Sequence, residues 1–370
     1  MRFSWGGGVS PALFALALAL ACVAVDMPSA WAETSTPAPR VSFFACPKGH
    51  DNIRTVPNEE LAIRSWLAMI PRPEVTMVEG RAGNGVDKFC TKFGLPKRTL
   101  KPKDLTRLKA PKVQSIFKAG ESGSPTDTVM YINSDILLPS NFMEILEFVY
   151  SQIPAEQHSS MMVVGGRTDC ENTDVGTEIV AQELSQAGEV DISKVEARMT
   201  TCKPAGEGAK DYFAYQKKFF QKKAGGMPPF AIGRGIWDSW IMKIAHYKGF
   251  AVDISPVVVA LHMNHDYNHG KGFKVSADKK IFTGEDGLMN KKLESASLKK
   301  AKILMPKAAM GNLRIAPKYR VCPSGPDGKG LKLWKNQGPQ WIYPSPLHVN
   351  ASIARMGACQ YAALFGCPCD

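Results

Sequence analysis

The sequence predicts an α/β domain in which a mostly parallel sheet carries helices on both of its faces. Short apolar runs that suit buried strands alternate along the chain with segments whose apolar residues recur at helical spacing. Several of these runs end in small or polar residues, which is where open α/β sheets bind their ligands. The chain has 370 residues, 44% of them hydrophobic, enough for one large domain or a domain with an appendage.

The first residues do not belong to this fold. Arg2 supplies a positive charge, residues 12–25 are an apolar run, and small residues precede a cleavage point after Ala32. This pattern predicts a signal peptide over residues 1–32, followed by a short linker over 33–40. Because the apolar run is shorter than the roughly 20 residues of a membrane span, cleavage is favoured over a signal anchor. We therefore expect a protein of the secretory pathway, in the ER or Golgi lumen or secreted, with no stable membrane span after cleavage.

The cysteines agree with this compartment. One of the nine, Cys22, lies in the predicted signal peptide, and the even number that remains favours disulfides. Cys170 and Cys202 are suited to close the long polar loop between them. The last three are expected to brace the C-terminal tail: Cys359, Cys367 and Cys369. Two closely spaced thiols at the end of the chain are a poor basis for a metal or redox site.

The formal net charge of +12 is concentrated between residues 88 and 112. Nine basic residues lie there beside Asp104: Lys88, Lys92, Lys97, Arg98, Lys101, Lys103, Arg107, Lys109 and Lys112. A solvated face is favoured over a binding surface for an anionic partner. No aromatic residue lies between Phe93 and Phe117, which is unfavourable for stacking on single-stranded nucleic acid. With no known RNA or DNA motif in a secreted chain, we expect no nucleic-acid partner.

The first half of the chain alternates strands with helices. Pro47 stops the first strand, and the proline-bracketed helix that follows has an apolar stripe at i, i+3, i+4 and i+7 that ends at Ile70. The expected elements are a strand at 41–46, a helix between Pro57 and Pro71, a strand at 74–78, a helix at 114–119 and a strand at 127–136.

The second half continues this pattern and then becomes irregular. Ser140 is placed to cap a helix, and a strand at 160–164 ends in two glycines. Residues 171–209 are polar and predict a loop over the sheet edge. Three ordered elements are expected after this loop. They are a segment at 211–215, a helix with an apolar stripe at Trp237, Trp240, Ile241 and Ile244, and a long strand at 252–261. No structure is predicted after Lys307.

Polar motifs follow these elements in a fixed order. The strand at 127–136 carries Asn133-Ser134-Asp135, and the strand at 252–261 leads into a segment that begins at His262. The full set of motifs is Ser42-Phe43-Phe44-Ala45-Cys46-Pro47-Lys48, Asn133-Ser134-Asp135-Ile136, Asp211-Tyr212-Phe213, Pro228-Pro229-Phe230-Ala231-Ile232-Gly233-Arg234 and His262-Met263-Asn264-His265-Asp266-Tyr267-Asn268-His269. In this order and spacing they resemble GT-A-fold glycosyltransferases, the nucleotide-diphospho-sugar transferases with a Rossmann-like sheet, and a family-2-like branch among them.

The resemblance covers about residues 41–295, so we expect a GT-A-like domain over 41–306 and a Cys-containing tail over 307–370. It implies a nucleotide-sugar donor and an acceptor hydroxyl on a glycan, protein or lipid that the sequence does not identify. In such folds the first strand and its loop hold the nucleotide. The residues that this implies for the nucleotide sugar are Cys46, Pro47, Lys48, Asn133, Ser134, Gly233 and Arg234.

The resemblance also implies a divalent cation, Mn²⁺ or Mg²⁺, that bridges the two phosphates of the donor. Asp135 lies where the family's DxD motif binds the metal, and Asn133 replaces the first carboxylate of that motif. Oxygen ligands suit these hard cations. A late histidine commonly completes the metal site, and His262 and His265 are both candidates.

The reaction needs a carboxylate that takes the proton of the acceptor hydroxyl in an inverting mechanism. Asp238 lies at the start of a helix, where the fold family usually places this base, although a carboxylate is favourable in a first helical turn in any case. Asp211 is the competing residue and alternatively holds acceptor hydroxyls.

Two other functions fit the same residues. The missing first aspartate is compatible with an inactive GT-A module that binds a nucleotide or a glycan without turnover. A zinc hydrolase would use His262, His265 and His269, whose spacing suits one helical face. The strand predicted before His262 argues against the hydrolase, because residues 262 and 265 of a strand face opposite sides.

Overall fold

The computed structural model describes residues 40–49, 55–170, 202–206, 208–263, 284–303, 313, 317–325, 330–335 and 358–367. These residues belong to one compact unit, Ala38–Asp370. The predicted signal peptide, and all of the predicted linker except Arg40, lie outside the described residues, so both stay predictions. Within the described ranges, no helix has both the length and the apolar character that crossing a bilayer requires.

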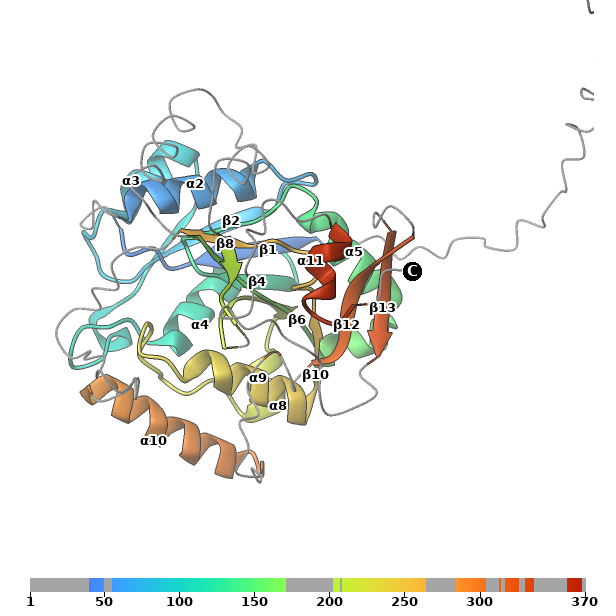
Figure 1. Ribbon diagram of the computed structural model, residues 1–370. Helices are drawn as coiled ribbons and strands as arrows, with labels where there is room; N and C mark the ends of the chain where they lie inside the picture. Colours follow the sequence, from blue (N-terminus) through green and yellow to red (C-terminus); the bar gives the residue numbers. More distant parts are fainter. Residues whose placement is uncertain are drawn as a thin grey trace, which may run out of the picture. The chain divides into compact units, whose positions relative to one another are not determined.

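Nine strands of the described residues form the main sheet, in the order β13-β12-β10-β6-β9-β4-β1-β2-β3 (Figure 1). They are β1 (Val41–Ala45), β2 (Glu74–Glu79), β3 (Lys97–Thr99), β4 (Thr128–Ile132), β6 (Met161–Gly166), β9 (Lys210–Gln216), β10 (Phe250–Asp253), β12 (Pro317–Ser324) and β13 (Gly330–Lys335). Strand β9 is antiparallel to both β4 and β6, and β13 is antiparallel to β12. The remaining pairs are parallel, which confirms the predicted α/β fold with a mostly parallel sheet.

A second sheet of four short strands has the order β5-β11-β7-β8. Its strands are β5 (Ile136–Leu137), β11 (Leu261–Met263), β7 (Thr168–Cys170) and β8 (Cys202–Pro204). In the chain, β5 follows β4, β7 follows β6 and β11 follows β10. The small sheet therefore lies beyond the carboxyl ends of these three strands of the main sheet.

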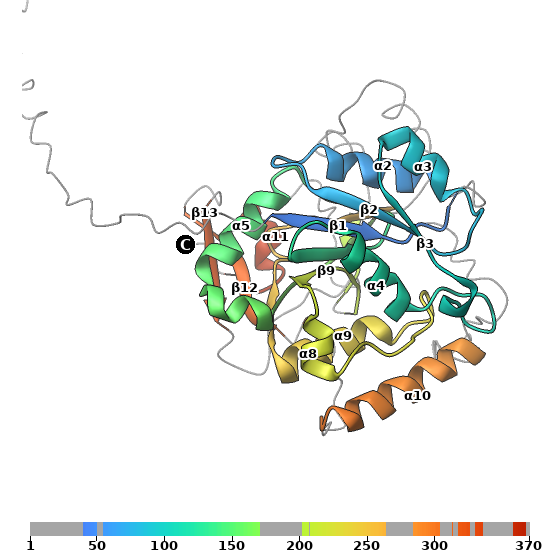
Figure 2. The ribbon, with the colours of Figure 1, turned by 180° about the vertical axis from the view of Figure 1, so that it is seen from behind.

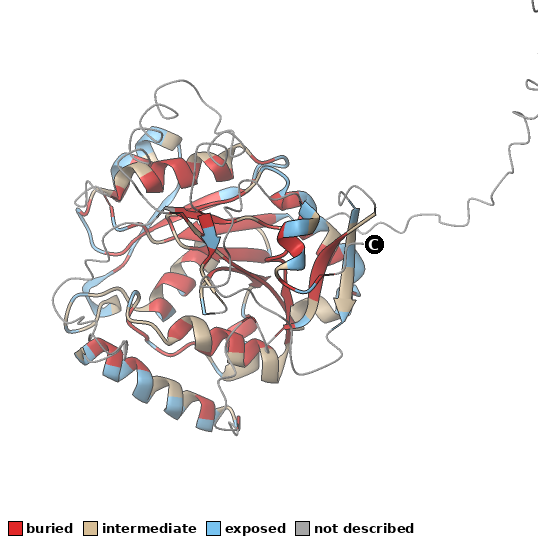
Figure 3. Ribbon diagram, viewed as in Figure 1, coloured by how far each residue is buried: buried red, intermediate tan, exposed pale blue. Residues whose placement is uncertain are grey.

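Helices cover both faces of the main sheet, as predicted (Figures 1 and 2). The described helices are α2 (Val56–Leu67), α3 (Val86–Phe93), η2 (Pro102–Asp104), α4 (Val113–Gly123), α5 (Phe142–Gln152), η3 (Ala155–Ser160), α8 (Phe219–Ala224), α9 (Trp237–Lys248), α10 (Glu285–Lys300) and α11 (Ala358–Ala363). Neighbouring side chains of β1 face opposite layers, since Phe43 packs against Trp66 of α2 and Phe44 packs against Phe117 of α4. The strands between these two layers are largely buried (Figure 3).

The predicted long strand at 252–261 is wrong. Strand β10 ends at Asp253, a turn follows, and β11 belongs to the second sheet. The turn forms because Asp253 Oδ1 accepts hydrogen bonds from both the backbone N–H and the hydroxyl of Ser255, and because Pro256 has no N–H to offer a ladder. Two buried strands joined by such a turn look like one apolar run in the sequence.

Two helix boundaries also differ from the prediction. The first helix ends at Leu67, and Ile70 is 82% exposed instead of lying on the buried stripe. Helix α5 takes Asn141 as its N-cap in place of Ser140, without a side-chain cap hydrogen bond. The reason is a turn closed by the hydrogen bond from Phe142 N–H to the Pro139 carbonyl, which delays the start of the helix by one residue.

The C-terminal segment, for which no structure was predicted, extends the main sheet. Strand β12 pairs in parallel with β10, and Cys322 forms a disulfide with Cys367. The expected bridge between Cys170 and Cys202 is present. Two disulfides are typical of an oxidising compartment. The free thiols of the described residues are Cys46, Cys90 and Cys359, so the even number of cysteines does not mean that all are paired.

The basic segment at 88–112 surrounds the edge strand β3, whose residues are all exposed. Part of its charge is paired with acidic residues of neighbouring elements. The ion pairs are Lys92 with Glu60, Lys97 with Glu79 and Arg107 with Glu285. Basic side chains at a sheet edge also oppose pairing with a strand of another chain.

Candidate functional site

The site lies where the order of the strands changes direction. From β1 the chain continues outward through β2 and β3, whereas β4 pairs with the other side of β1. The carboxyl ends of two such strands form the crevice in which open α/β sheets bind ligands. Residues 46–48 follow β1, and residues 133–135 follow β4. Two of the predicted motifs, Cys46-Pro47-Lys48 and Asn133-Ser134-Asp135, therefore come together at this point.

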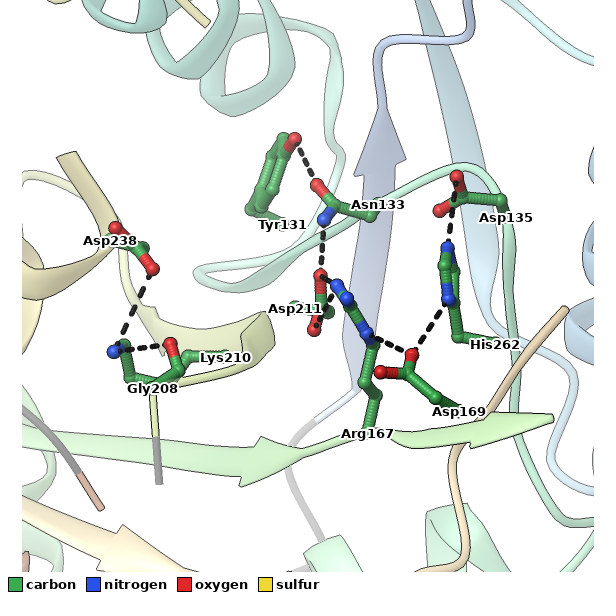
Figure 4. A network of polar contacts seen from close by, with 10 residues as sticks. All are labelled: Tyr131, Asn133, Asp135, Arg167, Asp169, Gly208, Lys210, Asp211, Asp238 and His262. Carbon is green, nitrogen blue, oxygen red and sulfur yellow. Dashed lines mark hydrogen bonds and ion pairs between the residues drawn. The ribbon is translucent and has the colours of Figure 1, made fainter. Parts of the chain in front are cut away.

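His262 and Asp135 face each other beside this crevice. Strand β11 pairs with β5 so that His262 lies opposite Ile136, and His262 Nε2 is 3.7 Å from Asp135 Oδ2 (Figure 4). The other ring nitrogen, Nδ1, is 2.9 Å from Asp169 Oδ1. Burial lowers the pKa of His262, but the two carboxylates outweigh it and raise the pKa to about 9. The sequence prediction that Asp135 and His262 meet is supported by this geometry.

Asp169 was not predicted as a site residue. Strand β7 places it opposite His262, and its Oδ1 also accepts a hydrogen bond of 2.7 Å from Arg167 Nε. Burial raises the pKa of Asp169, but the hydrogen bond from His262 and the charge of Arg167 lower it by more, so the net change is a decrease. The available signal was the alternation of Arg167 and Asp169 directly after a predicted strand, which puts both side chains on one side.

Asn133 and Asp211 bind each other. The side-chain amide of Asn133 donates to Asp211 Oδ1 at 2.5 Å, and its oxygen accepts from the Tyr131 hydroxyl at 2.7 Å. Arg167 Nη1 contacts both oxygens of the Asp211 carboxylate, at 3.1 and 3.3 Å. A carboxylate at position 133 would lie against Asp211. An amide at position 133 avoids this repulsion and donates a hydrogen bond instead.

We call the residues joined in this way the rim network, which consists of Tyr131, Asn133, Asp135, Arg167, Asp169, Asp211 and His262 (Figure 4). The buried Tyr131 forms one end of it, through the hydrogen bond from its hydroxyl to Asn133. Burial raises the pKa of Tyr131 well above its usual value, and the nearby Cys46, Asp135, Asp211 and Asp238 raise it further.

Asp238 lies at the edge of the rim network, in the first turn of α9. Its side chain is 22% exposed, and its Oδ2 is 3.6 Å from Nζ of the buried Lys210 (Figure 4). Lys210 also donates to the Gly208 carbonyl at 2.8 Å. The residue before α9, Ile236, has a φ of 74°, a strained conformation for a β-branched residue that is found most often at functional sites.

Gly233 and Arg234 lie in the turn that precedes α9. Gly233 has a φ of 66°, as a tight turn requires, and its carbonyl accepts a hydrogen bond of 3.3 Å from Arg234 Nη1. Burial lowers the pKa of Arg234, and the nearby Asp286 of α10 raises it, with a net decrease. Residues 264–283 lie outside the described part of the chain. The roles of His265 and His269, and with them the zinc hydrolase, therefore stay untested predictions.

Glu59 of α2 is a second residue that the sequence did not point to. It is 1% exposed, and its Oε1 accepts hydrogen bonds from the Lys48 backbone N–H at 2.8 Å and from the Ser134 hydroxyl at 2.9 Å. Among the described residues its Oε2 has no hydrogen-bond partner. Burial raises the pKa of Glu59 to about 7, against the lowering effect of these hydrogen bonds. Glu59 thereby ties the loop after β1 to the loop after β4.

The described residues contain no group of three or more His, Cys, Asp or Glu side chains arranged to hold a metal ion. Asp135 and His262 are two donors, 3.7 Å apart, which suits neighbouring positions around one cation. The hydrogen bond between Asp169 and Nδ1 is the second contact that metal-binding histidines commonly make. Magnesium-type sites often take one or two protein ligands and fill the rest with phosphate oxygens and water. The donor set therefore fits a cation that binds together with a diphosphate.

No model of a known protein family matches the sequence, and no curated protein matches it either. Solved structures do show similarity. TarS 1-349 from S. aureus in complex with UDP-GlcNAc has 12% identity and a TM-score of 0.42, over 70% of this chain and 66% of that chain. Mannosyltransferase PcManGT from Pyrobaculum calidifontis in complex with GDP-Man and Mn²⁺ has 14% identity and a TM-score of 0.37, over 63% of this chain and 60% of that chain.

Glucosyl-3-phosphoglycerate synthase from Mycobacterium tuberculosis, in complex with Mn²⁺, UDP and glucosyl-3-phosphoglycerate, has 14% identity and a TM-score of 0.35. The match covers 72% of this chain and 81% of that chain. The chain spans less than two thirds of the TarS and PcManGT chains. All three similarities are at low identity, and at these TM-scores they carry no argument about the site.

Replacing Asn133 by Asp should destabilise the protein. The new carboxylate would lie about as close to Asp211 as the amide does now, at 2.5 Å, with repulsion in place of a hydrogen bond. We expect a loss of about 2 kcal/mol or more in the free energy of unfolding at pH 7, measured by urea denaturation. Asn141→Asp is the matched control, because an exposed N-cap accepts either residue. Equal stability of Asn133→Asp and the parent protein would contradict the contact.

Glu59→Gln should change how stability depends on pH. The pKa of Glu59 is about 7 in the folded protein and 4.5 as the reference value, and Cys46, Asp135 and Lys48 are the charged or titratable groups around it. The unfolded chain therefore loses the proton first as pH rises, and the parent protein should lose about 3 kcal/mol of stability between pH 4.5 and 7.

Glu59→Gln has no carboxyl group to titrate at this position and should not lose this stability. Its free energy of unfolding should therefore increase relative to that of the parent protein as pH rises through that range. Urea denaturation at several pH values measures the shift. Glu147→Gln, at an exposed position of α5, is the control and should follow the parent protein. A difference between Glu59→Gln and the parent that stays constant with pH would show that Glu59 is not a buried acid.

Proposed function

We propose that this protein is a glycosyltransferase that moves a sugar from a nucleotide-diphosphate donor to an acceptor hydroxyl, with a divalent cation and with inversion. The observation that carries the proposal is that His262 Nε2 lies 3.7 Å from Asp135 Oδ2 beside the switch point of the sheet, in one network with Asp211. Asp238 pairs with Lys210, the neighbour of Asp211 in β9. These residues are far apart in the chain and belong to different elements. Their order also matches the motifs that resemble GT-A-fold glycosyltransferases.

The donor would bind across the loops after β1 and β4. Cys46, Pro47 and Lys48 would hold the nucleotide, and Glu59 fixes both loops through Lys48 and Ser134. Asp135 and His262 would hold Mn²⁺ or Mg²⁺, which supplies positive charge to the departing diphosphate. Asp169 keeps the His262 ring in place, so that Nε2 is directed toward Asp135.

Asp238 is the better candidate for the general base. Both oxygens of Asp211 are engaged by Arg167, and one also by Asn133, so that Asp211 is bound within the rim network. Asp238 is partly exposed and can reach an acceptor. In the transfer, the acceptor oxygen bonds to the anomeric carbon, the bond to the diphosphate breaks, and Asp238 takes the hydroxyl proton.

A binding module without turnover is the second candidate. The observation in its favour is that Asn133 contributes no carboxylate to the metal site. Such a module would still bind a nucleotide diphosphate with a cation. Turnover therefore separates the two functions. The acceptor class, whether glycan, protein or lipid, stays open in both.

Two variants should separate binding from chemistry. Uridine or guanosine diphosphate with Mn²⁺ should raise the melting temperature of the parent protein and not that of Asp135→Ala. Asp238→Asn should keep this stabilisation. On a donor and acceptor that the parent turns over, it should lower kcat by roughly 100-fold or more, the usual contribution of a general base.

Asp127→Asn is the control for both assays, since Asp127 is exposed and precedes β4 at its other end. Stabilisation of Asp135→Ala equal to that of the parent would exclude the metal assignment. Full turnover by Asp238→Asn would exclude it as the base. Stabilisation by nucleotide and cation with no transfer to any acceptor would favour the binding module.

A further inference from the structure

A buried ion pair joins the C-terminal segment to the main sheet. Arg320 of β12 and Asp253 of β10 are both fully buried, and Nε and Nη2 of Arg320 lie 2.9 and 2.8 Å from Asp253 Oδ2. Arg320 also donates to the carbonyls of Phe365, at 2.6 Å, and Leu313, at 3.3 Å. Such a pair is tolerated in a core only when its hydrogen bonds are satisfied. The guanidinium of Arg320 thereby joins three parts of the C-terminal segment, which are β12, Leu313 and Phe365.

The second carboxylate oxygen of Asp253 is connected to the site by hydrogen bonds through Ser255. Asp253 Oδ1 accepts from the Ser255 hydroxyl at 2.6 Å, and the same hydroxyl accepts from the Gly166 N–H at 2.7 Å. We call Arg320, Asp253 and Ser255 the buried anchor. Ser255 is 1% exposed, so water does not compete for these bonds. The direction of each hydrogen bond is set, because an amide can only donate.

Gly166 is the last residue of β6 and precedes Arg167. Its pairing with β9 is shifted by an irregularity between Gly165 and Gly166, so Ser255 fixes the backbone at a break in the ladder. From there Arg167 reaches Asp211 and Asp169, and Asp169 reaches His262. At the other end of β7, the disulfide of Cys170 closes the strand onto β8.

We propose that the C-terminal segment helps to position the side chains of the site. Ser255 is the positioning residue, because it connects this segment to Arg167 and Asp169 through the Gly166 backbone. If the ion pair of Arg320 and Asp253 only stabilised the core, it would not need to be linked through Ser255 to the Gly166 N–H, which is next to Arg167. The coupling stands on these hydrogen bonds alone. Its consequence for cation binding rests on the proposed function.

Hydrogen exchange on the full chain tests the coupling. In Ser255→Ala the Gly166 amide loses its acceptor, so peptides that cover residues 164–170 and 210–213 should exchange about tenfold faster or more. Peptides of β1 and β2 should not change. Ser65→Ala is the matched control, since this buried hydroxyl accepts from the Leu138 N–H at 3.2 Å, and it should affect only peptides near residues 62–65 and 136–138.

Arg320→Lys keeps the positive charge but loses the planar guanidinium that contacts Asp253 through two nitrogens. It should speed exchange in the same peptides as Ser255→Ala. If Arg320→Lys does not fold, Ser255→Ala still decides. Faster exchange confined to residues 253–257, or spread evenly over the chain, would overturn the proposal. A second readout is the Mn²⁺ concentration that gives half of the stabilisation by uridine diphosphate, which should rise in Ser255→Ala and not in Glu147→Gln, at an exposed position of α5. If the parent protein binds no nucleotide diphosphate, the proposed function fails, and the exchange result still stands.

Discussion

The site depends on one electrostatic constraint, which is that the buried carboxylate of Asp211 must be neutralised and hydrogen-bonded. Asp211 is 3% exposed, and a charge at that depth is costly unless it has partners. Arg167 supplies the charge, and Asn133 supplies a further donor. The same guanidinium then holds Asp169, which holds His262. The residue types at these positions follow from a single buried acid.

The topology explains why these residues meet. Strand β9 runs antiparallel between β4 and β6, so its first residues lie beside the last residues of both neighbours. Asp211, near the start of β9, is therefore next to Asn133 after β4 and Arg167 after β6. In the second sheet β11 also lies between two strands, antiparallel to β5 and parallel to β7, and its register places His262 opposite Ile136 and Asp169. His262 lies between Asp135 and Asp169 for that reason.

Much of this could be predicted from the sequence. Apolar runs that end in polar residues identified β1, β4 and β6, and the motifs pointed to Asp135, Asp211, Asp238 and His262. Glu59 and Lys210 were missed, because their roles come from contacts across the fold and leave no local pattern. Asp169 was missed although it alternates with Arg167 directly after a predicted strand. The turn at Ser255 was hidden in an apolar run. The C-terminal segment was not predicted, because its order comes from pairing with β10 and from Arg320.

In the proposed function, Asp135 and His262 hold one cation together with the diphosphate of the donor. Electron paramagnetic resonance of Mn²⁺ bound to the protein with uridine or guanosine diphosphate tests it most directly. We expect coupling of the Mn²⁺ to phosphorus and to an imidazole nitrogen, and we expect the nitrogen coupling to be lost in His262→Gln. Mn²⁺ that keeps the spectrum of the free aqueous ion with either nucleotide, or that retains its nitrogen coupling in His262→Gln, would contradict it.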